Sequence, residues 1–173
     1  MTAQQDWAEK QLFEPIEDMT GIHTPRHVLA RLSALLFPQE VVFVDARFEA
    51  QGRNADLWLV LFTEDLVAVL QGNGLNVMAP PSASHQAGNV TVVVLARRAL
   101  ESVEITEGGG PGTVAWNSNP EWQTGTENLT TWPFGGQLML RYRGRPSPLL
   151  LPFSDKAKFE EFVPQLMQDL ASD

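Results

Sequence analysis

Five arginines in two short stretches are the side chains of this sequence best suited to bind an anion. Arg97 and Arg98 are adjacent, and Arg141, Arg143 and Arg145 alternate along a later segment. A guanidinium offers a planar fork of N–H donors that binds carboxylate or phosphate. Arg141 and Arg143 would share one face of a strand. The pattern indicates either a patch for an anion or phosphoprotein, or a solvated sheet face balanced by carboxylates, and we favour the second interpretation.

Large aromatic side chains gather near residues 113–136, where the sequence is otherwise polar and irregular. They are Trp116, Trp122, Trp132 and Phe134. Tryptophan is enriched at binding hot spots, and long ordered loops often carry function. The alternative, which we favour, is that the rings fold back onto a core, because exposed rings lower solubility. Trp122 and Trp132 are nevertheless candidate partner-binding residues.

Metal-binding and catalytic arrangements find little support. His23 and His27 are four residues apart, but the helix start predicted at Thr24 falls between them, and His85 lies in a predicted loop. No His-Glu-x-x-His or Gly-x-Ser-x-Gly occurs, and no Gly-Lys-Ser/Thr follows the glycines at 108–112. We expect no metal, no cofactor and no catalytic residue, and we predict that the protein is not an enzyme.

Composition limits the classes of partner. The 173 residues carry a net charge of −9 and include no cysteine, so disulfides and thiolate chemistry are excluded. Such a charge repels nucleic acid and anionic membranes at long range. The first residues do not resemble a signal peptide, and the apolar runs are too short to cross a bilayer. We therefore expect a cytoplasmic protein without a nucleic-acid partner, and we do not expect membrane association.

Hydrophobic periodicity predicts the elements that position these side chains. A weak helix is predicted over 4–14 and a linker over 15–23. A stronger helix is predicted over 24–37, with Thr24 as its cap and Pro25 at its first position. Strands dominate from there, and the surest hairpin joins 57–62 to 66–70. About seven strands are predicted, mostly antiparallel because their connections are short. Eight candidate segments supply them, near 42–49, 57–62, 66–70, 90–96, 100–105, 113–116, 138–143 and 149–153.

A final amphipathic helix is predicted over 155–170. Pro164 lies inside it, where proline removes one backbone hydrogen bond and costs about 3 kcal/mol. We expect a kinked or two-piece helix held in place by burial of Phe159 and Phe162. Its apolar stripe comprises Phe159, Phe162, Val163, Leu166, Met167 and Leu170.

This order of elements resembles the pleckstrin-homology-like (PH-like) family, including its bacterial-type and GRAM-like members. Three segments carry the resemblance: the hairpin at 57–70, the strand pair at 93–105, and the final hairpin with its helix at 138–170. The resemblance implies a mainly β (α+β) fold, an antiparallel β-barrel or roll capped by a C-terminal helix. The helices predicted before residue 40 are an addition to that basic fold, so we expect a helical extension over 1–38 with one or two helices, followed by the PH-like domain over 39–173.

The resemblance, together with the lack of a catalytic pattern, predicts a non-catalytic module for protein–protein interaction. One mode would be strand addition at an open edge beside 90–96. An alternative is a small-molecule-binding or enzymatic protein with a cavity between the sheet and the tryptophan-rich insert at 117–136. A second alternative is weak binding to anionic lipid, for which the first hairpin offers only Arg47 and Arg53. The helix over 24–37 either packs on the sheet or forms a surface for a homodimer.

Overall fold

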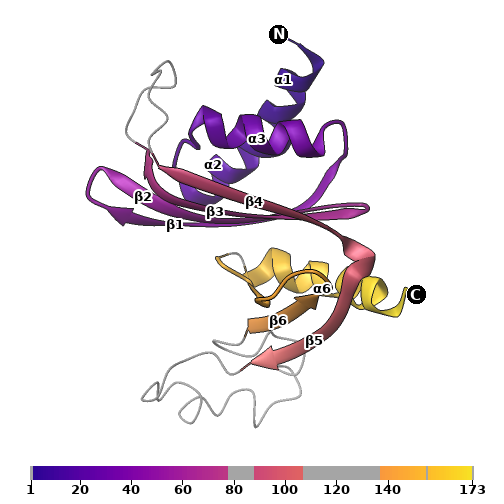
Figure 1. Cartoon of the computed structure of the whole chain (residues 1–173). Coiled ribbons are helices and arrows are strands. Elements are labelled where there is room, and N and C mark those ends of the chain that lie inside the picture. Colours follow the sequence, from indigo (N-terminus) through magenta and orange to yellow (C-terminus); the bar gives the residue numbers. More distant parts are fainter. Residues whose placement is uncertain (1, 78–87, 107–136, 155, 173) are drawn as a thin grey trace, which may run out of the picture. The chain divides into compact units, whose positions relative to one another are not determined.

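The computed structural model describes residues 2–77, 88–106, 137–154 and 156–172 (Figure 1). The chain forms two compact units. Unit 1 comprises Met1–Ala99 together with Phe153–Asp155, and unit 2 comprises Leu100–Pro152 together with Lys156–Asp173. The boundary predicted between residues 38 and 39 stays a prediction.

Unit 1 begins with a helical segment in three parts: α1 (Ala3–Ala8), the π-helical η1 (Glu9–Phe13) and α2 (Glu14–Thr20). A capping box starts it, because the Gln5 amide donates to the Thr2 hydroxyl while the Thr2 amide donates to the Gln5 side chain. The linker predicted from residue 15 is wrong as far as Thr20. Pro15 stands in the first turn of α2, where the N–H that proline lacks is not required and its fixed φ suits the helix. Gly21 ends α2 with a φ of 67°.

The next helix, α3 (Arg26–Leu36), matches the predicted position of the second helix. Its cap differs from the prediction, since Pro25 is the N-cap and no side chain makes a capping hydrogen bond. The hydroxyl of Thr24 is instead buried without a hydrogen-bond partner. The apolar stripe of α3 is buried at Val28, Leu32 and Leu36.

Four antiparallel strands in the order β1-β2-β3-β4 form the sheet of unit 1. They are β1 (Val41–Gln51), β2 (Asn54–Thr63), β3 (Leu66–Asn76) and β4 (Asn89–Ala96). The predicted hairpin is confirmed, because β2 pairs with β3 in antiparallel register. Figure 1 shows the three helices on one face of this sheet. The core between them consists of Leu12, Ile16, Val28, Leu32, Leu36, Ala46, Leu57, Leu59, Leu61, Ala68, Leu70 and Leu75.

The opposite face of the same sheet is also apolar near one end of the strands, which explains the continuous apolar run of β2. Val60, Phe62 and Val67 are fully buried there. Asp45 is fully buried on β1 and accepts hydrogen bonds from the backbone N–H groups of Phe153 and Ser154 and from the Ser154 hydroxyl. These bonds join Phe153 and Ser154 to the sheet of unit 1.

Unit 2 contains three antiparallel strands in the order β5-β6-β7 and one long helix. The strands are β5 (Leu100–Thr106), β6 (Gln137–Tyr142) and β7 (Leu149–Leu151), and the helix is α6 (Lys156–Ala171). α6 is one helix that runs through Pro164, so a two-piece helix is wrong; a bend at Pro164 stays a prediction. Its stripe is buried as predicted at Phe159, Phe162 and Leu166, whereas Met167 is exposed.

The predicted closed barrel is wrong, although the α+β class, the antiparallel pairing and the C-terminal helix are confirmed. Across the described ranges, the seven strands form two open sheets of four and three strands. The ladder stops after β4 because the chain enters the 3-10 turn η2 (Arg97–Ala99). Arg97 holds this turn against the β2–β3 hairpin, since its backbone N–H donates to the Asp65 carbonyl at 2.8 Å. The strand predicted at 113–116 lies outside the described residues.

Candidate interaction edge of the four-stranded sheet

β4 forms one edge of the sheet of unit 1, and in the described part of the chain no strand pairs with its outer side. Its pairing with β3 is regular. Eight consecutive residue pairs run without a register shift, from Asn73 opposite Asn89 to Leu66 opposite Ala96. β4 therefore presents a straight row of backbone donors and acceptors at the sheet edge.

The side chains of β4 lack the features that commonly protect a sheet edge. Natural sheets block their edges with charged residues, proline, bulges or very short strands. β4 reads Asn-Val-Thr-Val-Val-Val-Leu-Ala, with no charge and no proline, and its β-branched residues favour an extended chain. By sequence and register, this strand is a template on which another strand could pair.

The ladder bond at Arg97 sets which backbone groups point outward. The Arg97 N–H donates to the Asp65 carbonyl, and hydrogen-bonded pairs alternate along an antiparallel ladder. The residues of β4 that bond β3 are therefore the odd-numbered ones. The N–H and C=O groups of Val90, Val92 and Val94 consequently point away from β3. Their side chains pack against the helix-covered core. The side chains of Thr91, Val93 and Leu95 alternate with them and lie on the opposite face.

Both ends of β4 are anchored. At its start, Gly88 has a φ of +93°, and an added Cβ would lie 2.6 Å from the Asn73 carbonyl oxygen, so only glycine fits. At its end, Arg97 is 7% exposed and donates from its guanidinium to the Thr63 carbonyl at 2.7 Å. The Arg97 guanidinium also lies over the Phe62 ring, 5.9 Å from its centroid. Arg97, a candidate for binding a partner, thus holds the strand in place.

The other candidate arginines lie mostly on the surface. Arg98 is exposed in η2 of unit 1. Arg145, in unit 2, is half-buried and donates to the Ser147 carbonyl at 2.8 Å, and burial lowers its pKa. The two arginine stretches belong to different units, Arg97 and Arg98 to unit 1 and Arg141, Arg143 and Arg145 to unit 2.

Arg141 lies on β6 and Arg143 lies in the turn directly after it, and both side chains are exposed. Each pairs with a carboxylate of β5 at 3.0 Å, Arg141 with Glu104 and Arg143 with Glu101. Exposed ion pairs of this kind contribute about 0–1 kcal/mol to stability. The pairing supports the interpretation of a solvated face balanced by carboxylates.

Several candidates lie outside the described residues. They include Trp122 and Trp132, and with them the insert that the small-molecule alternative requires. His85 and the glycines at 108–112 also belong to this group. Their expected roles stay predictions.

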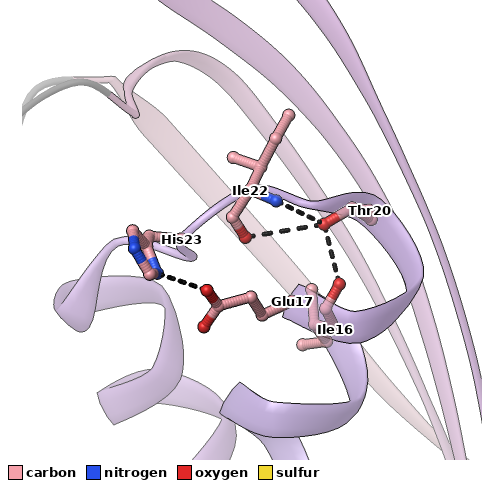
Figure 2. Close-up of polar contacts among 5 residues, drawn as sticks. All are labelled: Ile16, Glu17, Thr20, Ile22 and His23. Atoms are coloured by element: carbon pink, nitrogen blue, oxygen red, sulfur yellow. Dashed lines mark hydrogen bonds and ion pairs between the residues drawn. The ribbon is translucent and has the colours of Figure 1, made fainter.

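The two remaining histidines have different surroundings. Figure 2 shows His23 directed at Glu17, with Nδ1 and Oε1 3.0 Å apart, beside the turn that the Thr20 hydroxyl stabilises through bonds to Ile16 and Ile22. His27 lies on α3 with a buried Nε2 that lacks a hydrogen-bond partner. Burial, and secondarily the charge of Arg31, lowers the pKa of His27. No group of three potential metal ligands occurs among the described residues.

Sequence reasoning missed a second feature of the β4 side of unit 1, the charge of α3. This helix packs over β4 and carries exposed Arg26 and Arg31 but no acidic residue. The composition of residues 26–36 contains that signal, but its relevance depends on the position of the helix.

Comparison with known protein families, with curated proteins and with solved structures found no match. The PH-like resemblance therefore stays a prediction. In the described ranges, no helix combines the length and apolar character needed to cross a membrane.

Proposed function

We propose that this protein is a non-catalytic module that binds an extended segment of another protein by strand addition at β4. The observation that carries the proposal is the regular, uncharged edge of β4, anchored at both ends. In this mode of recognition, main-chain hydrogen bonds contribute affinity and the alternate side chains contribute specificity.

The outward groups of three residues limit the strength of such an interaction. Val90, Val92 and Val94 together offer three donors and three acceptors, and each net hydrogen bond contributes about 0.5–1.5 kcal/mol. Ordering the incoming segment offsets much of this gain. We therefore propose a reversible interaction within the cytoplasm on a scaffold of PH-like type, with side-chain contacts deciding between partners.

The test places proline at the centre of the edge. The Val92 N–H does not pair with β3, so Val92→Pro removes an outward donor while keeping the ladder, as edge strands permit. The probe is an eight-residue peptide that alternates valine and threonine, followed by amide chemical shifts of the protein. Peptide addition should shift the amides of Val90, Val92 and Val94 in the unchanged protein.

Two further variants complete the experiment. Val92→Thr keeps the backbone donor and a β-branched side chain, so it should retain binding. Thr91→Lys places a charge on the exposed edge without touching the core and should abolish binding, as edge lysines do in natural sheets. Shifts that persist in both Val92→Pro and Thr91→Lys, or an absence of any shift at β4 in the unchanged protein, would refute strand addition there.

A further inference from the structure

We infer that the segment added to β4 is acidic, with Asp or Glu at alternate positions on the helix-covered side and apolar residues on the other side. This inference rests on the proposed function and names the chemistry of its partner. It follows from the distribution of charge around β4 and from the apolar rows that end at this strand.

The helix nearest to β4 is basic. α3 packs over β4, as Figure 1 also shows, and its charged side chains Arg26 and Arg31 are both exposed. The Arg31 guanidinium donates to the His27 carbonyl at 2.8 Å, which holds part of this charge at the helix surface. Arg98, directly after β4 in η2, is a third exposed cation of unit 1.

The acidic residues described in unit 1 lie on other elements. None belongs to α3, β3 or β4. Glu64 and Asp65 lie in the turn between β2 and β3, and the Asp65 carbonyl bonds Arg97 just after the C-terminal end of β4. The remainder lie on the first helical segment, before or along β1, and on β2; they are Asp6, Glu9, Glu14, Glu17, Asp18, Glu40, Asp45, Glu49 and Asp56. The net charge of −9 would repel an acidic segment from most of the surface and so direct it to the α3–β4 side.

The opposite face of the sheet explains the expected alternation. Two cross-strand rows end at β4, one running from Val60 through Val69 to Val93 and the other from Phe62 through Val67 to Leu95. Their last members, Val93 and Leu95, are only half-buried. Apolar residues of an added strand would prolong these rows and bury more apolar surface. The alternate residues of that strand would then lie on the side of α3, where carboxylates would meet Arg26 and Arg31.

The experiment compares three fluorescent eight-residue peptides that alternate valine with glutamate, glutamine or lysine. Fluorescence anisotropy measures their affinity for the full-length protein at about 0.15 M salt, where exposed charges farther than about 8 Å apart are largely screened. The glutamate peptide should bind on the order of five- to tenfold more tightly than the glutamine peptide, as two or three exposed charge pairs would give. The lysine peptide should bind most weakly.

Reversing the charge of α3 tests whether Arg26 and Arg31 cause the preference for the glutamate peptide. The double variant Arg26→Glu/Arg31→Glu should invert the order, so that the lysine peptide binds most tightly. Arg53→Glu is the control, because it makes the same kind of charge change at an exposed residue between β1 and β2. It should leave the order unchanged. Circular dichroism establishes that each variant is folded.

Different results would refute strand addition at β4 and the acidic character of the added segment. If no peptide binds to the unchanged protein, the proposed strand addition is refuted. If the three peptides bind equally well, or if the preference for glutamate survives the double reversal on α3, the acidic partner is refuted while strand addition stands.

Discussion

The two edges of the four-stranded sheet differ in how their outer sides are covered. β1 has a register shift between Val41 and Phe43, and helical segments supply side chains to its backbone. The Val41 N–H donates to the Gln11 side chain at 2.9 Å, and the Ala46 N–H lies 3.2 Å from the Met19 sulfur. β4 has neither a register shift nor, in the described ranges, a side chain that accepts from its outward N–H groups.

Charge sharpens the contrast between these edges. β1 carries the buried Asp45 and the exposed pair Arg47–Glu49 at 3.1 Å, with Arg47 lying over the Trp58 ring, 4.8 Å from its centroid. β4 carries no charge. A bulge, charges and helix contacts are the devices by which sheets prevent unwanted pairing. One edge of the sheet is therefore closed by internal contacts, whereas the other keeps the features needed for pairing.

Removing the buried carboxylate of β1 should have the largest effect on stability. Asp45→Ala leaves the N–H groups of Phe153 and Ser154 without their carboxylate acceptor in a buried environment. We expect a loss of about 3 kcal/mol in the free energy of unfolding, measured by urea denaturation. Asp45→Asn keeps one acceptor oxygen and should lose less. A loss below about 0.5 kcal/mol for Asp45→Ala, as is usual for surface substitutions, would contradict this role.

An intermediate effect is expected where β4 begins. Gly88→Ala introduces a Cβ against the Asn73 carbonyl at a positive φ, and should cost about 1–3 kcal/mol. Gly52→Ala, between β1 and β2, is the matched control, because Gly52 has a φ of +68° but no atom within 4 Å of the added Cβ. Thermal unfolding of both variants separates steric contact from backbone strain. Equal losses would show that the close approach at Gly88 does not hold β4.

The smallest expected effect is a pH dependence of the protein's stability that arises from His27 on α3, the helix that covers β4. The folded state lowers the pKa of His27 below 6.5, so the unfolded chain binds a proton more readily. Stability from this group is therefore complete above pH 6.5 and is lost as pH falls toward the lowered pKa. His27→Gln should lose less stability between about pH 7 and about pH 5 than the unchanged protein, as measured by chemical denaturation. Identical pH profiles would contradict the assignment.

Short-range patterns predicted most of the secondary structure. The pairing of β2 with β3 followed from two apolar runs with the turn between them, and the stripe of α6 followed from helical spacing at Phe159, Phe162 and Leu166. The linker predicted from residue 15 was wrong up to Thr20 because proline is compatible with the first turn of a helix. The barrel was wrong because no local signal indicated that the ladder ends at η2.

At the β4 edge, too, the sequence predicted the strand but not its surroundings. The sequence predicted the strand at 90–96 and its apolar character, and proposed strand addition beside it. It did not show that α3 lies over this strand, because that contact joins segments far apart in the chain. It treated Arg97 and Arg98 alike, although only Arg97 is buried.

The sequence by itself determined the elements of this protein, since the period of apolar residues fixes which segments can bury one face as a helix or a strand. Only the tertiary structure decided that β4 is an edge, that β1 is closed by Gln11 and Met19, and that Asp45 binds Phe153 and Ser154. These contacts join residues about 25 to 110 positions apart. Burial and hydrogen bonding depend on which surfaces meet after folding, and residue spacing does not encode that information.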